Sequence, residues 1–399
     1  MQCTQGLRIK VNSSLLISPV EYDDFVKSYW ESQPLHVSRK DTHHFSDLLS
    51  VDGIKSFIND NAVIFPDVSA VNSRSSIPVS DYTNDQRRVN ADQLFKQHEQ
   101  GGTIIVNEVH KKFAAVRELC VHINKDYQLR CQANAYLSPP GNQGFHSHYD
   151  THDVFVLQVA GCKTFRFYPS DIELPFTNDT FHPDDDSEDE VVEQVELSAG
   201  DTLYIPRGIV HDALASEGEP SLHITLGVFP FVIRDLLQEM IQVAAERDVR
   251  LRRSVELSVS DGAAASSQRL PLNVFKEGVV FNEEIYAEAV SRLADEVAVD
   301  CHQVAVSSGT VESVTVEQMD ANTVVTVNHS AIHGAEYRDG LFKLRLAGQV
   351  VQFTEPLSAA VAKLLDQETM KVESLPGLDV EQQLALCHQL VALGVVDIR

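Results

Sequence analysis

Two histidines and one carboxylate occur in this chain at spacings that suit metal coordination. His148 and Asp150 lie two residues apart in Gly144-Phe-His-Ser-His-Tyr-Asp150, and His211 closes the later run Gly200-Asp-Thr-Leu-Tyr-Ile-Pro-Arg-Gly-Ile-Val-His211. In an extended chain, residues two apart point to the same face, so the first two side chains can bind one ion. Two histidines and one carboxylate form the ligand set of mononuclear non-haem iron sites. The sequence therefore predicts a metal site assembled from two separate segments.

The spacing alone leaves the set of ligands open. His146 and His152 share the face of His148 and Asp150 if the whole segment is an ideal strand. His148, Asp150 and His211 would suit iron, whereas His146, His148 and His211 would form an all-histidine site for zinc or another metal. We expect the histidines that are not ligands to contact the ligands or to face a substrate.

Short β-type segments surround these residues and would have to position them. Gly, Pro and Asn residues separate the segments, a pattern that is typical of β-sandwiches and β-barrels. We therefore predict a β-barrel of the jelly-roll type, whose interior is the natural pocket for a metal and its ligands. The expected strands are residues 131–137, 154–159, 164–168, 202–205 and 222–228.

Helical patterns precede and follow the predicted barrel. An amphipathic segment at 19–30 and small helices at 45–49 and 54–57 would form an N-terminal elaboration. After Pro230, apolar residues recur every three or four positions, and Asn282 is a suitable N-cap for a further helix. Helices with wide apolar faces must bury those faces, which favours a homodimer.

The last third of the chain predicts a small winged-helix-like module. Its expected strands and helices are residues 323–327, 341–346, 350–353, 356–365 and 380–393. The start of the second helix carries Asp379 and Glu381 and no basic residue. Such a helix would bind phosphate poorly, so direct DNA binding is not expected.

The composition is that of an acidic globular protein. The net charge is −26 and the apolar share is 43%, so the chain can bury a core, repels nucleic acid and attracts basic partners. Six dispersed cysteines give no disulfide or zinc-ribbon pattern. The sequence shows neither a membrane span nor a signal-peptide layout, so we expect a cytoplasmic protein. The acidic run at 184–190 is expected to be a solvated loop, and the polar stretch at 254–268 a linker.

Several stretches of the chain resemble the JmjC-type ribosomal oxygenases of the cupin superfamily. These stretches are residues 29–37, 133–140, 143–150, 154–158, 161–168 and 200–211. Members of that family are peptidyl hydroxylases that depend on ferrous iron and 2-oxoglutarate. The resemblance implies a JmjC catalytic domain with a double-stranded β-helix and N-terminal helices at 1–230. It further implies a helical dimerisation segment at 231–315 and a winged-helix-like module at 316–399.

The resemblance also assigns roles to individual residues. It places the metal ligands at His148, Asp150 and His211, which selects iron over the all-histidine alternative. Three ligands on one face of the ion leave room for 2-oxoglutarate and dioxygen. The distal carboxylate of 2-oxoglutarate needs a cation, and the family's lysine falls on Lys163, although a strand lysine can also point outward.

Other polar side chains on the predicted strands could contact the same cosubstrate. Asn134 and Tyr136 alternate onto one face of a strand and can donate hydrogen bonds. His223 and Thr225 share a face of another strand, where Thr225 could bind the cosubstrate and His223 could support a ligand or be satisfied in the core. Arg207 is expected to pair with a nearby carboxylate.

Together these features predict a ferrous iron- and 2-oxoglutarate-dependent dioxygenase that hydroxylates a side chain of a basic protein or peptide, such as a ribosomal protein. An alternative substrate is the precursor peptide of a natural product, recruited by strand addition at an exposed edge, for instance at 341–346. An alternative of another class is a non-catalytic, acidic, dimeric scaffold that binds a structural metal. The intact ligand candidates and Lys163 argue against that alternative.

Overall fold

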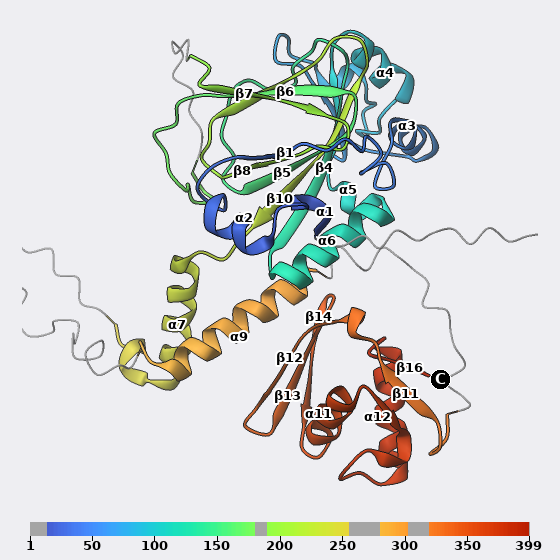
Figure 1. Cartoon of the computed structure of the whole chain (residues 1–399), viewed down its shortest axis with the longest axis vertical. Coiled ribbons are helices and arrows are strands. Elements are labelled where there is room, and N and C mark those ends of the chain that lie inside the picture. The colour runs from blue at the N-terminus through green and yellow to red at the C-terminus, as the bar shows by residue number, and fades with distance from the viewer. Residues whose placement is uncertain (1–13, 180–189, 255–279, 302–318, 399) are drawn as a thin grey trace, which may run out of the picture. The chain divides into compact units, whose positions relative to one another are not determined.

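The computed structural model describes residues 14–179, 190–254, 280–301 and 319–398 (Figure 1). It divides after Phe229 into two compact units, here called unit 1 and unit 2. The predicted acidic loop, apart from Glu190, and the predicted linker, apart from Ser254, lie outside the described residues. Within the part of the chain that is described, no helix is long and apolar enough to cross a membrane.

Unit 1 contains two antiparallel sheets. The larger sheet has the strand order β1 (Leu35–Val37), β8 (Thr202–Ile205), β5 (Asp153–Ala160), β10 (Ser221–Phe229), β4 (Arg130–Ser138), β3 (Thr103–Val106) and β2 (Val68–Val71). The smaller sheet has the order β7 (Glu193–Ser198), β6 (Cys162–Phe167) and β9 (His211–Ala215). The predicted strands are therefore present, but the described strands form two separate sheets rather than one closed barrel.

The two faces of the larger sheet differ in chemistry because side chains alternate along each strand. On β10, Leu222, Ile224 and Leu226 belong to the main hydrophobic core of unit 1, whereas His223 and Thr225 face a cavity. Their register partners continue the pattern, since His223 pairs with Tyr136 and Thr225 with Asn134 on β4. The alternation thus separates a hydrophobic face from a polar face that can hold a ligand.

The N-terminal helices of unit 1 contribute to the hydrophobic face. They are α1 (Ser14–Ile17), α2 (Tyr22–Ser28), α3 (Val51–Asp60), α4 (Ala91–Glu99), α5 (Val109–Lys112) and α6 (Ala114–Tyr127), with a short 3-10 turn η1 (Val79–Asp81). The Ser50 side chain caps α3 by accepting a hydrogen bond from the Gly53 amide at 3.0 Å. The predicted helix at 45–49 is wrong, because these residues form turns that bury Phe45, Leu48 and Leu49.

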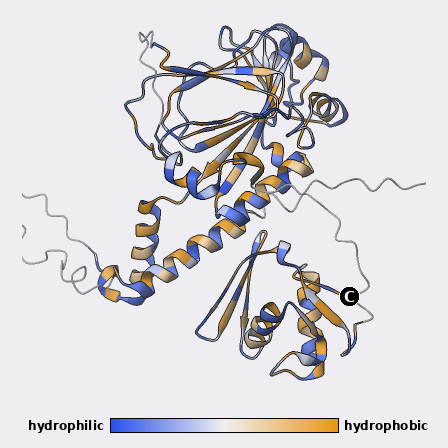
Figure 2. Cartoon of the chain, in the orientation of Figure 1, coloured by the Kyte–Doolittle hydropathy of each residue, from blue (hydrophilic) through white to orange (hydrophobic). Residues whose placement is uncertain are grey.

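Unit 2 begins with two packed helices, α7 (Ile233–Arg247) and α9 (Glu283–Asp300), with the 3-10 turn η2 (Val249–Arg252) after α7. Asn282 caps α9 as predicted, since its side chain accepts a hydrogen bond from the Ile285 amide at 2.9 Å. Met240 and Ala289 belong to the small core between the helices. Both helices carry hydrophobic and hydrophilic residues along their length (Figure 2).

The other described residues of unit 2 form two three-stranded sheets and two α-helices. Its elements are β11 (Val324–Val327), η4 (His329–Ala331), β12 (Ile332–Arg338), β13 (Leu341–Leu346), β14 (Gln349–Thr354), α11 (Leu357–Gln367), β15 (Thr369–Lys371), η5 (Val372–Ser374), α12 (Val380–Ala392) and β16 (Val396–Ile398). One sheet has the order β12-β13-β14 and the other β15-β11-β16. Because β13 is the central strand, the expectation that residues 341–346 form an exposed edge is wrong.

Candidate metal centre and its cavity

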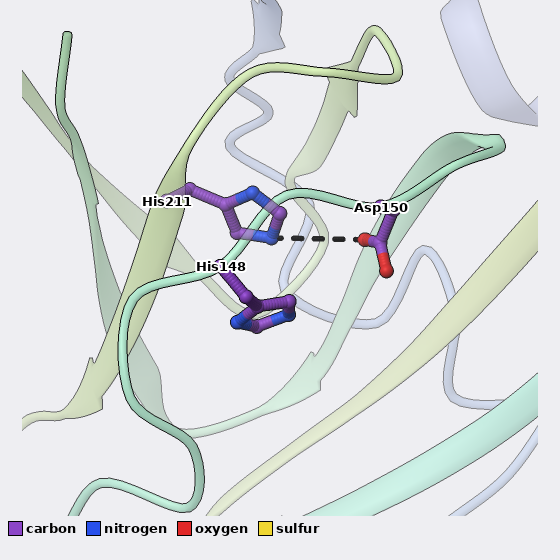
Figure 3. A group of neighbouring side chains, drawn as sticks. All are labelled: His148, Asp150 and His211. Atoms are coloured by element: carbon purple, nitrogen blue, oxygen red, sulfur yellow. Dashed lines mark ion pairs between the residues drawn. The ribbon is translucent and has the colours of Figure 1, made fainter. Parts of the chain in front are cut away.

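His148, Asp150 and His211 lie together in unit 1, with one ligand-type atom of each within 4.8 Å of the others (Figure 3). The Asp150 carboxylate lies 3.8 Å from the Nε2 atom of His211. His211 begins β9, whereas His148 and Asp150 lie in the extended loop before β5. The two segments predicted to carry the ligands therefore meet at one point.

The hydrogen bonds of the two imidazoles leave the same ring atom of each free to bind a metal. The Nδ1 atom of His148 lies 2.8 Å from the His146 carbonyl oxygen, and the Nδ1 atom of His211 lies 3.0 Å from the Ile209 carbonyl oxygen. Because a carbonyl only accepts hydrogen bonds, each Nδ1 atom must carry the proton. The Nε2 lone pairs are then available, and two neutral nitrogens with one carboxylate oxygen suit a divalent metal.

Backbone hydrogen bonds hold the two ligand segments side by side. The His148 amide donates to the His211 carbonyl at 3.0 Å, and the His211 amide donates to the His148 carbonyl at 2.8 Å. The Asp150 carbonyl accepts a third bond, from the Gly208 amide at 3.0 Å. The spacing of all three ligands is therefore set by main-chain contacts.

The structure separates the two competing sets of ligands. His146 is exposed, does not line the cavity, and contributes its carbonyl oxygen to His148 rather than its ring to the cluster. The assumption that residues 146–152 form an ideal strand is wrong, because only an isolated bridge at His148 interrupts this loop. His152 does line the cavity, and its ring stacks on Phe229 with the centroids 4.7 Å apart.

The cluster opens into a cavity of about 310 Å³ between the two sheets of unit 1. Lys163, Asn134, Tyr136 and Thr225 all line it, as the sequence predicts. The sequence did not single out several other lining residues, which include Thr103, Gln132, Gly144, Phe145, Gly227 and Phe229. Thr103 belongs to β3, which precedes the expected barrel, so no local pattern marked it.

Lys163 projects inward from the smaller sheet and is 4% exposed. Its Nζ atom donates to the Ser138 hydroxyl at 3.1 Å, and that hydroxyl also accepts a bond from Thr103 at 3.0 Å. Burial lowers the pKa of Lys163 to about 7, since an ammonium group loses its hydration there. The alternative of an outward-facing lysine is therefore wrong.

Other polar side chains of the cavity can offer hydrogen-bond donors to a ligand. The side-chain oxygen of Asn134 accepts a bond from the Glu108 amide at 2.8 Å, which leaves its NH₂ group as the donor. Burial, followed by the nearby Asp150 carboxylate, raises the pKa of Tyr136 to about 12, so its phenol stays protonated and can donate. Thr225 faces Asn134 across the β10–β4 pair.

An ion cluster of four residues, here called the Arg207 cluster, fixes the loop that leads to His211. The Arg207 guanidinium contacts Asp153 and Glu31, each at 2.6 Å, and the Tyr204 hydroxyl donates to Asp153 at 2.8 Å. Burial alone would lower the pKa of Arg207, but the attraction of the two carboxylates outweighs burial and raises it. The carboxylate pairing expected for Arg207 is confirmed.

The comparisons with known proteins agree with this fold and site. Residues 108–236 match the JmjC domain family. That range contains all three clustered residues and both sheets' central strands, so the part of unit 1 that matches the JmjC family includes the metal centre.

Two of the sequence relatives are insect proteins. The chain is 30% identical over 308 residues to an Aedes aegypti protein named bifunctional lysine-specific demethylase and histidyl-hydroxylase NO66, covering 70% of this chain and 46% of that protein. A Drosophila willistoni protein of the same name is 30% identical over 281 residues, covering 65% of this chain and 35% of its own length. The chain thus spans less than half the length of these curated relatives.

The solved structures show the same fold over nearly the whole chain. The Escherichia coli ribosomal oxygenase YcfD has a TM-score of 0.52 at 17% identity, covering 95% of this chain and 98% of that protein. A complex of YcfD with cobalt and 2-oxoglutarate has a TM-score of 0.51 at 18% identity, covering 96% and 99%. The chain therefore shares the fold of this ribosomal oxygenase, and its residues 108–236 match the JmjC domain family, as its sequence motifs suggested.

Proposed function

We propose that this chain is a ferrous iron- and 2-oxoglutarate-dependent dioxygenase that hydroxylates a side chain of a protein or peptide. The observation that carries the proposal is the convergence of His148, Asp150 and His211 in a cavity that also contains the buried Lys163. The names of the relatives, a histidyl-hydroxylase and a ribosomal oxygenase, support the same chemistry.

A ferrous ion with 2-oxoglutarate and dioxygen would supply the oxidising chemistry that inserts oxygen into a C–H bond. His148, Asp150 and His211 would hold the ion through two Nε2 atoms and one carboxylate oxygen. Lys163 would bind the distal carboxylate of 2-oxoglutarate, while Asn134, Tyr136 and Thr225 are the proposed hydrogen-bonding residues. The buried walls of the cavity would exclude water from the reacting groups.

The proposed substrate is basic. The net charge of −26 favours association with a cationic partner, and a ribosomal protein is the leading candidate. The ribosomal oxygenase name of the structural relative supports this choice. A ribosomal target is also compatible with the predicted cytoplasmic location.

The proposed domains are a catalytic domain at 1–230, a dimerisation segment at 231–315 and a winged-helix-like module at 316–399. A row of exposed apolar side chains on α7 supports a homodimer, because Ile233, Leu237 and Ile241 recur every four residues and are 78%, 38% and 47% exposed. Tyr286 and Val290 add exposed apolar area on α9. Burying such area against a second copy would be favourable.

The proposed activity is tested by incubating the protein with Fe(II), dioxygen and 2-oxoglutarate, with and without basic ribosomal peptides. We expect succinate formation and a peptide that gains the mass of one oxygen atom. His148→Ala and Asp150→Ala should abolish both products, because each removes a metal ligand. His146→Ala is the matched control and should retain them, since this neighbouring histidine is exposed and lies outside the cavity. Full activity in the two ligand variants would contradict the proposal.

Metal analysis separates the enzyme from the non-catalytic scaffold. An oxygenase purified without chelators should exchange Fe(II) readily and respond to 2-oxoglutarate. Tightly held zinc without any response to 2-oxoglutarate would favour the scaffold.

A further inference from the structure

The inner part of the cavity brings two basic side chains together from facing sheets. Lys163 comes from β6 of the smaller sheet, and His223 comes from β10 of the larger sheet. Both side chains line the cavity, and they are 4% and 5% exposed. We call these two residues the basic pair.

The described residues offer the basic pair no anionic partner. In the parts of the chain that the structure describes, Lys163 forms no ion pair, and its Nζ atom donates to the neutral Ser138 hydroxyl. The buried Nδ1 atom of His223 has no hydrogen-bond partner among the described residues. Burial, followed by the charge of Lys163, lowers the pKa of His223 well below its usual value. A buried lysine without an anion and a buried imidazole nitrogen without a hydrogen-bond partner are both unfavourable, so an anion that accepted hydrogen bonds from both would be stabilised here.

Aromatic contacts fix the plane of the His223 ring. The ring stacks on Tyr136 with the centroids 4.9 Å apart and an interplanar angle of 7°. The stack follows from the strand register, because His223 and Tyr136 are direct partners across β10 and β4. The Phe165 ring also contacts His223 edge to face, with the centroids 6.1 Å apart. His223 is therefore held in one orientation beside Lys163.

The basic pair lies within reach of the metal centre. The Phe165 ring contacts His223 and also His211, with the second pair of centroids 6.5 Å apart. One aromatic ring thus separates the basic pair from a metal ligand, and all of these residues line one cavity. A short molecule with an anionic group at each end could bind the metal and the basic pair at once.

We infer that His223 acts with Lys163 as an anion site that selects 2-oxo acids with a distal carboxylate. In this assignment His223 is a binding residue for the cosubstrate rather than a support for the metal ligands. The inference rests on the proposed function, because it takes 2-oxoglutarate as the molecule whose other end binds the metal.

The test compares two 2-oxo acids that differ in the distal carboxylate. The protein is loaded with Co(II), and the binding of 2-oxoglutarate and of 2-oxobutyrate is measured by calorimetry without any turnover. His223→Phe keeps an aromatic ring against Tyr136 and removes both nitrogens. We expect 2-oxoglutarate to bind about tenfold more weakly or worse, because a hydrogen bond to a charged group is lost. The affinities for 2-oxobutyrate and for Co(II) should not change.

A second variant tests the inference in case His223→Phe does not fold. His223→Gln keeps a polar side chain and should weaken 2-oxoglutarate binding less than His223→Phe does. The inference is overturned if both variants bind 2-oxoglutarate as the wild type does, or if the two 2-oxo acids lose affinity equally. Wild-type protein that binds neither 2-oxo acid in the presence of Co(II) would overturn the proposed function itself, and the inference with it, so the two failures are distinguishable.

Discussion

Lys163 of the basic pair and Asp153 of the Arg207 cluster are both buried ionisable groups, but of these two only Asp153 has an oppositely charged partner among the described residues. Asp153 is fully buried, and its carboxylate is matched by Arg207 and by the Tyr204 hydroxyl. Lys163 is almost as buried, and its partner within the described ranges is the neutral Ser138 hydroxyl. A neutralised cluster stabilises the fold, whereas an unneutralised cation costs stability and is retained when a ligand needs it.

The largest effect on stability is expected from breaking the neutralised cluster. Arg207→Met leaves Asp153 buried without its cation, and we expect a loss of about 3–5 kcal/mol in the free energy of unfolding. Urea denaturation measures this loss. Lys111→Met is the control, since it removes a partly exposed ion pair with Glu108 and should cost less than about 1 kcal/mol.

A double variant sharpens this result. Adding Asp153→Asn to Arg207→Met removes the stranded charge and should restore a large part of the lost stability. If Arg207→Met is no less stable than Lys111→Met, the cluster does not have the structural role assigned to it.

Removing the cation of the basic pair should not lower the stability of the protein, in contrast to Arg207→Met. Lys163→Met removes an unneutralised cation and replaces it with an apolar chain of similar length. We expect the free energy of unfolding to stay the same or to rise by about 1 kcal/mol or more. The affinity of the Co(II)-loaded protein for 2-oxoglutarate should fall about 100-fold, because the carboxylate loses its cation. A variant that loses stability but binds 2-oxoglutarate normally would reverse the comparison.

The pH dependence of stability reports on the same lysine. The pKa of Lys163 is about 7 in the folded protein and near 10.5 when it is unfolded. Between these values the unfolded chain binds more protons, so stability should rise with pH through this window. We subtract the free energy of unfolding of Lys163→Met from that of the wild type. This difference should rise by up to about 1.4 kcal/mol per pH unit between pH 7 and 9. A flat difference would mean that Lys163 is neutralised after all.

The smallest effect is expected at an ion pair of intermediate burial. Arg166 is about one-third exposed and contacts Asp212 with two nitrogens, while the Gln143 side chain and the Tyr168 hydroxyl also donate to this carboxylate. Because these two donors remain, Arg166→Met should cost about 1 kcal/mol in unfolding free energy. A loss as large as that of Arg207→Met would show that burial is not what distinguishes the clusters.

The sequence predicted the cavity best where a strict period of two applies. Asn134 and Tyr136 on β4, and His223 and Thr225 on β10, face the cavity because alternate residues of a strand share a face. The same reasoning gave a wrong prediction for His146, because the loop before β5 is not a strand. There the His146 carbonyl oxygen, and not its ring, contacts the metal ligand His148.

Contacts between distant segments could not be predicted in this way. The cation of Asp153 comes from Arg207, and that guanidinium also binds Glu31, far earlier in the chain. The pairing depends on which strands lie side by side, and no local spacing encodes that arrangement. Likewise, the basic pair becomes visible only when β6 and β10 face each other across the cavity.

The backbone bridge between His148 and His211 affects how the metal can be loaded and replaced. Two reciprocal main-chain hydrogen bonds hold these residues together without help from an ion. The ligands are therefore assembled before any metal arrives, and little ordering is left for the binding step. We expect a chelated protein to keep its folded spectrum and to be reloaded by simple addition of metal, so that a centre damaged by oxidation can be renewed without refolding the chain.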